Sequence, residues 1–457
     1  MSKKNVSKSI KSSIQSFEEI PLLHPSAAGI DIATEEHWVC IPPGRAPANV
    51  LKFGSYTRDL QEICDWLREC GVTTVAMEST SVYWIPLYQM LESKGIEVYL
   101  VNARQIKNVP GRTKTDKLDC QWIQKLHSFG LLSASFRPDE QTCQLRSYLR
   151  HRDNLIRKSS KEIQYMQKSL DQMNVLLHKV VTDITGKTGI KIIEAILSGQ
   201  HDASKLSKMR YKNIKCSEKE IALALNGDFR SEHLFSLEQS LMGYKFIQLQ
   251  IESCEHEIEL LLEKWHKKAE YQGSNRTLKN LRGKASIKQE VNKARLYEVS
   301  GVDLTEIPSF NISTIQTMVS ETGLDMSKWK SAKHFASWLG LCPCPDISGG
   351  KVLKHKTKKV QSRAAKALRL TARTVARSES YLGAFYRRLK ARVGPSKAIT
   401  ATAHKLAIIY YKMLKEAKSY KELGVNYYAQ NHERRILRSL KKKAELVGYQ
   451  LVPIKEG

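Results

Sequence analysis

The sequence has no long apolar run. No segment approaches the roughly 18–20 consecutive apolar residues that a membrane-spanning helix needs, and the most apolar stretch, residues 406–411, predicts part of a buried helix. The first ten residues are basic and rich in serine but lack the apolar core of a signal peptide. These absences argue against a membrane or secreted protein and predict a soluble, intracellular one.

Cysteine is sparse and irregularly spaced. The nine cysteines are an odd number without a regular spacing, which argues against a disulfide framework and for a reducing compartment. Cys342 and Cys344 form the one close pair. Because no second pair accompanies them, we expect two small buried side chains there rather than a zinc site.

Acidic residues are few relative to basic ones. The 457 residues include 74 Lys and Arg against 46 Asp and Glu, a formal net charge of +28. Residues 351–457 alone hold 27 basic and 6 acidic residues. Such a surplus indicates a polyanionic partner, of which nucleic acid is the commonest. We expect nucleic-acid contacts from basic residues of this region: Lys351, Lys354, Lys356, Lys358, Lys359, Arg363, Arg387 and Arg388.

The first part of the chain alternates strand and helix patterns. This alternation predicts an α/β domain whose sheet is partly parallel. A helix is predicted over 115–126, with Thr115 as its N-cap. The predicted strands are 27–32, 37–41, 49–53, 73–78 and 96–101, and the predicted helices between them are 60–70 and 82–93.

The middle of the chain changes to long helices. Apolar residues recur at three-four spacing from Ile156 to Val180 and again from Leu237 to Trp265, a pattern typical of coiled-coil seams. Two such helices must pair either with each other or with another subunit, and the sequence leaves both possibilities open. Beyond them we expect a basic linker, a mainly helical unit with a turn-rich loop over 340–350, and a basic helix at 433–443.

Four carboxylates lie on predicted elements of the α/β domain. Asp31 is in the first strand, Glu78 ends a later strand, and Asp116 and Asp119 share one face of a helix. Sites form at the strand ends of open α/β sheets, and converging carboxylates need a divalent cation such as Mg²⁺ or Mn²⁺ between them. Two such ions support phosphodiester chemistry. Taken singly, each carboxylate is better explained as a helix cap or a solvated charge, and only the set of four indicates a metal site.

Ser348 is followed by two glycines and a lysine-rich segment. The glycines let the backbone approach a phosphate closely, and a serine there is a candidate nucleophile if its hydroxyl is activated. The residues alone favour a simpler interpretation, a turn followed by solvated lysines.

Several motifs together resemble the DEDD transposases of the insertion-sequence "one-ten" family. The similarity covers roughly residues 27–420. It departs at Glu306–Asn311, where family members often carry Ile-Pro-Gly-Ile-Gly. The matching motifs are Gly29–Ala33, Met77–Thr80, Lys114–Asp119, Gly130–Leu132, Asp183–Gly189, Lys333–Pro343, Ser348–Lys351 and Ala398–Ala407.

The resemblance implies an α/β plus α architecture. The implied parts are a flexible basic N-terminus (1–26), a RuvC-like, RNase H-type DEDD domain (27–140), a helical coiled-coil insertion (141–270), a basic linker (271–295), a mainly helical transposase domain bearing the serine (296–420) and a basic C-terminal tail (421–457). It implies metal binding by Asp31, Glu78, Asp116 and Asp119, and a nucleophilic Ser348.

The resemblance also implies an activity. Family members are transposases or recombinases guided by a structured noncoding RNA, the bridge RNA, which pairs with donor and target double-stranded DNA. They act as dimers that assemble into tetramers, and they exchange strands through a Holliday-like junction without ATP. We therefore expect a nucleoid-associated protein of a prokaryotic cytoplasm. The residues leave one alternative open, a metal-dependent, RuvC-like, structure-specific endonuclease that acts by hydrolysis.

Overall fold

The computed structural model describes residues 21–106, 115–211, 214–271 and 284–452. The chain forms two compact units, Met1–Arg137 and Pro138–Gly457. The first boundary lies close to the predicted one at residue 140. The later divisions, at residues 270, 295 and 420, fall within the second unit and stay predictions. None of the described helices is long and apolar enough to cross a membrane.

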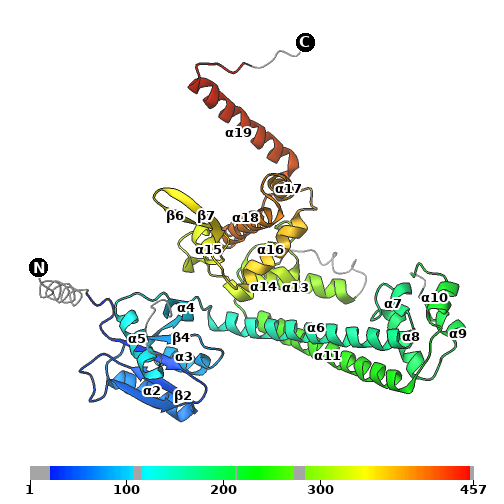
Figure 1. Cartoon of the computed structure of the whole chain (residues 1–457), viewed down its shortest axis with the longest axis horizontal. Coiled ribbons are helices and arrows are strands. Elements are labelled where there is room, and N and C mark those ends of the chain that lie inside the picture. The colour runs from blue at the N-terminus through cyan, green and yellow to red at the C-terminus, as the bar shows by residue number, and fades with distance from the viewer. Residues whose placement is uncertain (1–20, 107–114, 212–213, 272–283, 453–457) are drawn as a thin grey trace, which may run out of the picture. The chain divides into compact units, whose positions relative to one another are not determined.

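The first unit is built on a five-stranded sheet of order β3-β2-β1-β4-β5 (Figure 1). The central strand β1 pairs antiparallel with β2 and parallel with β4, and β4 pairs parallel with β5. This confirms the predicted mixed α/β domain. The strands, each within one residue of its predicted bounds, are β1 (Ala27–Ile32), β2 (Glu36–Cys40), β3 (Val50–Gly54), β4 (Thr74–Glu78) and β5 (Glu97–Val101).

Helices cover both faces of this sheet. On one face, α2 (Thr57–Glu69) and α3 (Trp84–Ser93) pack on the apolar side chains of alternate strand residues. On the other, α5 (Asp116–Ser128) packs with a smaller apolar cluster, next to the short α4 (Ala103–Ile106). Thr115 caps α5 as predicted, because its side chain accepts a hydrogen bond from the backbone N–H of Leu118.

The second unit begins with two long helices that pair within the chain. α6 (Glu140–Gln172) and α11 (Ser231–Glu263) run antiparallel, since Ser159 bonds Gln248 at 2.8 Å and the Tyr148 carbonyl accepts from Cys254 at 3.4 Å. The predicted seam is only partly correct. α6 ends before residue 177, so the last seam residues belong to the separate helix α7 (Leu177–Val180). Ile156 is 45% exposed.

The far end of this helix pair is closed by short helices. α7, α8 (Lys187–Leu197), α9 (Ala203–Ser207) and α10 (Glu218–Ala224) enclose an apolar core together with the ends of α6 and α11. At the near end, Arg150 of α6 binds Glu321 through both carboxylate oxygens at 2.9 Å. Arg146 donates to the neighbouring Ser320 carbonyl at 3.0 Å. These bonds tie the helix pair to the C-terminal helices.

The C-terminal part is helical with one hairpin. Residues 284–295, predicted as linker, instead form most of helix α13, whose Leu296 and Val299 are buried. The predicted loop 340–350 contains strand β6, and β7 precedes the basic helices. Cys342 and Cys344 are half-buried rather than buried, and all nine cysteines are free thiols. The elements are α13 (Lys284–Ser300), α14 (Ile312–Thr322), α15 (Ala332–Trp338), β6 (Pro343–Ser348), β7 (Lys351–Thr357), α16 (Arg363–Val375), α17 (Tyr381–Val393), α18 (Pro395–Glu416) and α19 (Gly424–Leu446).

The segment that departs from the family pattern retains the turn. Ser309 has φ 64°, the left-handed conformation that glycine adopts without strain. Two residues on, Asn311 caps α14 by accepting a hydrogen bond from the Thr314 N–H at 2.8 Å. Ser309 therefore fills a glycine-type position in the connection to α14.

Candidate active site

Asp31 and Glu78 lie on neighbouring strands and on the same face of the sheet. β1 and β4 are parallel with Ile30 opposite Met77, so the next residues in this register are Asp31 and Glu78. Ile30 and Met77 point into the core beneath α2 and α3. Because side chains alternate along a strand, the two carboxylates point to the opposite face, where α5 lies. Both residues are half-buried.

A glycine lets α5 lie directly on β1. A Cβ atom on Gly29 would sit 2.2 Å from the backbone nitrogen of Gln124 and 2.5 Å from the carbonyl oxygen of Cys120. The Gln124 amide in turn donates to the Ala27 carbonyl at 3.2 Å. No side chain larger than hydrogen fits at residue 29 unless the helix moves, so glycine fixes the height of α5 above the sheet.

The N-terminal turn of α5 carries the other two carboxylates. A hydrogen bond with Cys40 and burial raise the pKa of the Cys120 thiol, and the nearby Asp31 carboxylate raises it further. Because Asp31 lies near Cys120 while Ala27 lies near Gln124, α5 runs antiparallel to β1. Its first turn, with Asp116 and Asp119, is thus at the strand end that holds Asp31.

Helix capping does not explain Asp116 and Asp119. Thr115 is the N-cap, and the two aspartates follow it in the first turn, Asp116 exposed and Asp119 half-buried. A carboxylate is favoured there by the partial positive charge of the helix end. The sequence motif extends back to Lys114, which lies outside the described residues.

The four carboxylates have the right ligand type for a divalent cation, but their side chains are not grouped closely enough to hold one. Carboxylate oxygens are the ligands that Mg²⁺ and Mn²⁺ prefer, and the backbone brings these residues to one end of the sheet. Within the described ranges, however, no three acidic, histidine or cysteine side chains are grouped so as to hold a metal ion. Cys342 and Cys344 likewise belong to no such group of three among the described residues.

Ser348 belongs to the second unit and ends strand β6. It pairs with Lys351 across a two-residue turn whose glycines, Gly349 and Gly350, have φ values of 53° and 75°. Two positive φ values are the signature of a type I′ hairpin turn. A Cβ on either glycine would contact nothing within 4 Å, so the backbone conformation alone calls for glycine. The interpretation as a turn is confirmed, and this turn presents an exposed serine.

Two family models match the chain. A DEDD transposase model of the IS110 type, described as "Transposase", matches residues 28–175, and a model described as "Transposase IS116/IS110/IS902 family" matches residues 303–387. The first match contains all four carboxylates, and the second contains the Ser348 hairpin. The chain belongs to the IS110 family of transposases. Among curated proteins, none matches it.

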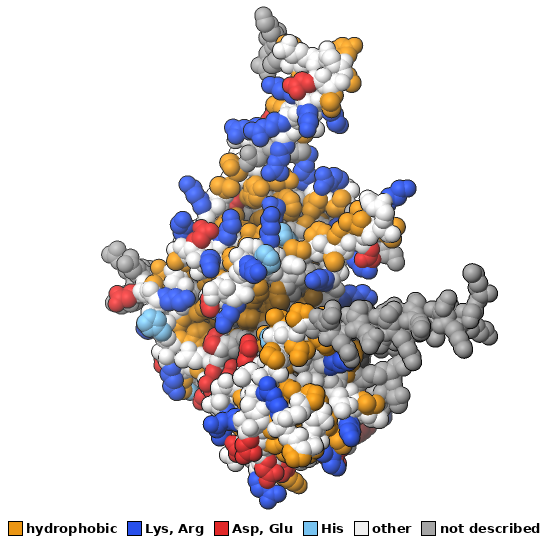
Figure 2. All heavy atoms as spheres, turned by 90° about the vertical axis from the view of Figure 1, so that its left-hand side faces the viewer, with side chains coloured by type: hydrophobic (Ala, Val, Ile, Leu, Met, Phe, Trp, Pro, Cys, Tyr) orange, Lys and Arg blue, Asp and Glu red, His pale blue; other side chains and the backbone are white. Residues whose placement is uncertain are grey.

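As an IS110-family transposase the protein is an enzyme that acts on DNA as a transposase or recombinase. This confirms the resemblance read from the motifs. Figure 2 shows Lys and Arg side chains along α19 and around its base, the basic region expected for a nucleic-acid partner.

Some of the residues predicted to contact nucleic acid are exposed, and others already pair within the chain. Lys351, Lys358 and Arg388 are exposed. Lys356 pairs with Asp346 at 2.7 Å on the hairpin, Arg363 pairs with Asp153 of α6 at 3.0 Å, and Arg387 donates to the Ala376 and Ser378 carbonyls at 3.0 and 2.8 Å. Arg363 and Arg387 thus already bind other parts of the chain. The side chain of Lys354 lies outside the described residues, and Lys359 has an interaction of its own.

Sequence reasoning missed one cationic cluster of this transposase. Arg392, Lys405 and Arg435 lie with Arg388 around a pocket formed by α17, α18 and α19. A signal for it was present, since Tyr381, Phe385, Arg388 and Arg392 follow one another at intervals of four, three and four residues along α17.

Proposed function

We propose that this transposase cuts and rejoins donor and target DNA with Ser348 as the nucleophile. The observation that supports this is the exposed position of Ser348 at the tip of a hairpin whose glycines are required by the turn alone. A hydroxyl on such a tip can reach a phosphate that would not fit into a closed cleft. Lys351, its cross-strand partner, supplies a positive charge beside it.

The proposed step conserves the energy of the phosphodiester bond. Ser348 Oγ forms a bond to the scissile phosphorus, and one P–O bond of the DNA backbone breaks. The serine proton is lost to a base, and the departing DNA oxygen gains a proton. Reversal with a different DNA end rejoins the strands, so passage through a Holliday-like junction needs no ATP.

The RuvC-like carboxylates serve the same reaction in this proposal. Asp31 and Glu78 on the sheet, and Asp116 and Asp119 on α5, would hold Mg²⁺ or Mn²⁺. When bound, such an ion stabilises negative charge that develops on a phosphate. The carboxylates themselves are positioned by strand register and by the contact of α5 with Gly29.

Guidance by a bridge RNA fits the charge distribution. Residues 351–457 carry 27 basic and 6 acidic residues, more cations than a single serine site requires. In this scheme base pairing reads the donor and target sequences, while the protein contacts backbone and shape. Affinity for both nucleic acids should then fall steeply as salt concentration rises.

A stripe on α11 supports assembly into dimers and tetramers. Phe235, Met242, Phe246 and Leu249 are 59–63% exposed and, at 100° per residue, lie opposite the buried face of the helix. A second copy of the chain is the occupant we propose for this stripe. The variant Phe246→Glu should lower the sedimentation-derived mass at micromolar concentration, whereas Ser204→Glu, an added charge on α9, should leave it unchanged. An unchanged mass for Phe246→Glu would count against this assembly surface.

One observation favours a second function, hydrolysis by a metal-dependent, structure-specific endonuclease. In the described part of the chain, no hydrogen bond joins the Ser348 hydroxyl to a base. An unactivated serine is a poor nucleophile. The carboxylates would then activate water, and Ser348 would be a turn residue only.

The two functions differ in the product that forms. Purified protein, Mg²⁺, the flanking noncoding RNA and end-labelled donor DNA would be mixed, and protein–DNA adducts that survive boiling in detergent would be measured. We expect an RNA-dependent adduct with wild type and with the matched exposed-serine variant Ser327→Ala, and none with Ser348→Ala. Free cleaved ends from all three proteins, without an adduct, would establish the hydrolytic function instead.

A further inference from the structure

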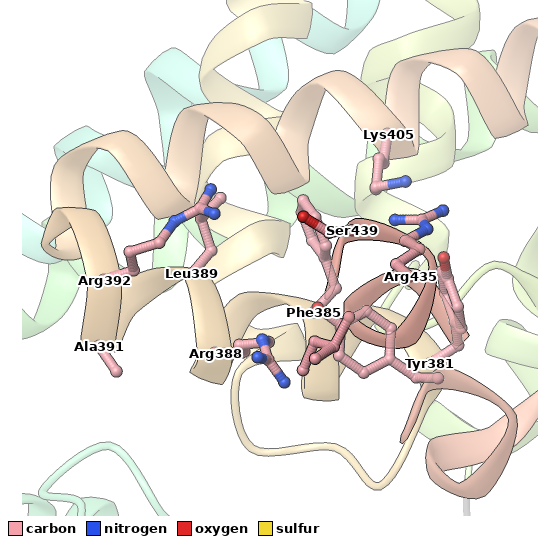
Figure 3. Close-up of a pocket in the computed structure, with 11 residues that line it drawn as sticks. Tyr381, Phe385, Arg388, Leu389, Ala391, Arg392, Lys405, Arg435 and Ser439 are labelled. Carbon is pink, nitrogen blue, oxygen red and sulfur yellow. The ribbon is translucent and has the colours of Figure 1, made fainter. Parts of the chain in front are cut away.

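The pocket formed by α17, α18 and α19 is lined by residues that have no role in either candidate reaction. Its volume is about 680 Å³. Its wall combines aromatic rings with four cationic side chains (Figure 3). The lining residues that matter here are Tyr381, Phe385, Arg388 and Arg392 of α17, Lys405 of α18, and Tyr428 and Arg435 of α19.

The rings form one connected set. The Tyr428 ring meets Tyr381 and Phe385 edge to face, with centroid distances of 5.2 and 6.3 Å. The Lys405 ammonium lies 4.7 Å from the centroid of Phe385 and 5.8 Å from that of Tyr381. Phe385, Tyr381 and Tyr428 are only partly buried, so part of their surface remains open to a ligand.

The cations gather without acidic partners. Within the described ranges, no carboxylate pairs with Arg388, Arg392, Lys405 or Arg435. Burial lowers the pKa of Lys405, and the charge of Arg435 lowers it further. Burial raises the pKa of Tyr428, while the positive charges of Arg388, Arg435 and Arg392 oppose that rise, and all three arginines line the pocket together with Tyr428. Such a group of like charges is relieved by a bound anion.

We propose that this pocket holds one unpaired nucleotide, with its base against the rings and its phosphate among the arginines. A bare phosphate would have no use for three rings, and an apolar segment would leave four cations unpaired. The volume falls within the roughly 300–1,000 Å³ of small-molecule sites, which suits one nucleotide rather than a base pair. Base stacking on aromatic rings together with arginine contacts is how proteins bind single strands.

This inference rests on the proposed function, because the nucleotide belongs to the guide RNA or to a DNA strand freed during exchange. Both sources present the same chemistry, a base and a phosphate outside a duplex. The test therefore uses RNA and DNA probes in parallel. Each probe is a short duplex with a single unpaired 2-aminopurine, compared with the same duplex fully paired and with an abasic residue at the unpaired position.

Binding would be measured by anisotropy with the full-length protein at fixed salt, and stacking by quenching of the 2-aminopurine fluorescence. We expect the unpaired probe to bind about tenfold more tightly than the paired and abasic probes, with quenching on binding. The preferred backbone, ribose or deoxyribose, identifies the source. Equal affinity for all probes without quenching would overturn the proposal.

Variants then locate the effect. Tyr381→Leu should abolish the preference and reduce quenching, whereas Tyr381→Phe, which keeps the ring, should retain both. Arg388→Gln with Arg435→Gln should remove the preference for the unpaired probe. The matched pair Arg438→Gln and Lys442→Gln, on α19 but outside the pocket lining, should weaken all probes equally and keep the preference.

The outcomes separate this inference from the proposed function. A preference that persists unchanged in every pocket variant would place the unpaired nucleotide elsewhere and overturn the pocket assignment. Adduct formation by wild type and its loss in Ser348→Ala is a different measurement with different residues. The pocket proposal can therefore fail while the serine mechanism stands, and the reverse.

Discussion

Asp31 and Glu78 lie on central strands of a sheet that is packed on both faces, whereas Ser348 ends a strand of the two-stranded β6-β7 hairpin. The carboxylates are positioned by the same contacts that fold their unit, including strand register and the approach of α5 to Gly29. The serine depends on a turn and a few cross-strand bonds. Damage to the fold should therefore remove the carboxylate site first, while damage to the hairpin should leave the fold intact.

The largest expected effect is from Gly29→Ala. The added Cβ would meet backbone atoms of Gln124 and Cys120 at 2.2–2.7 Å, which cannot rotate away as a side chain could. We expect a loss of about 3 kcal/mol or more in the free energy of unfolding of the first unit. Urea unfolding with pulse proteolysis, and fragments assigned by mass spectrometry, would measure it. Gly44→Ala, which has open space around it but a φ of 81°, is the control for backbone strain alone. A Gly29→Ala protein as stable as wild type would contradict the close packing of α5.

A second prediction concerns acid and the same unit. Burial lowers the pKa of His127 to about 4, with a further contribution from His24. Its Nε2 lies 2.9 Å from the Thr74 hydroxyl, and its buried Nδ1 has no hydrogen-bond partner among described residues. Since the unfolded chain takes up a proton near pH 6.5 and the folded unit only near pH 4, stability should fall as pH drops between these values.

The size of this loss follows from the two pKa values. It should reach about 3 kcal/mol below pH 4, and it should be fully recovered above pH 6.5. Urea midpoints of the first unit between pH 7 and pH 4 would test it. In His127→Gln, which removes the titrating group, the midpoint should vary much less with pH. An equal pH dependence in both proteins would assign the effect to other groups.

The hairpin should respond differently from the sheet. Gly350→Ala places a Cβ on a residue with φ 75°, at a cost of about 1 kcal/mol, but with no steric contact. We expect faster proteolysis within 343–357 and less serine adduct, with no change in the unfolding of the first unit. Gly350→Asn should be milder, because asparagine tolerates the left-handed conformation. Loss of stability in the first unit would contradict the expectation that the hairpin can be damaged without affecting the carboxylate site.

The buried strands were predicted from the sequence more accurately than the exposed ones. All five strands of the first unit were predicted within one residue, because apolar alternation and burial go together there. Strands β6 and β7 were missed, since their prolines and lysines carry no burial pattern and the type I′ turn holds them together. The role of Gly29 was not predictable either. It depends on a helix that arrives about 90 residues later in the chain.

The heptad pattern was informative about pairing and less so about register. Met166, Leu170, Leu237 and Leu241 of the predicted seams are buried, but the pattern also included the exposed Ile156. Residues three and four apart lie on nearly the same helix face, so spacing alone does not fix which of them turns inward. The four carboxylates were predicted from their order along the chain. That Asp31 and Glu78 share one face of the sheet follows only from the register of β1 and β4.

The smallest effect should come from Ser309→Gly. This variant introduces a glycine at a strained position, whereas the glycine variants above remove one. Ser309 is held at φ 64°, where an L residue is strained by about 1–2 kcal/mol. Glycine relieves that strain but gains freedom in the unfolded chain, so we expect a net stabilisation of about 0.5–1 kcal/mol. Ala417→Gly, at φ 49° after α18, should behave alike, and a urea midpoint of the second unit would record both. If Ser309→Gly were destabilising while Ala417→Gly stabilised, the serine side chain would have to make a contact that offsets its backbone strain. The turn before α14 would then be held by its side chains as well as by its backbone.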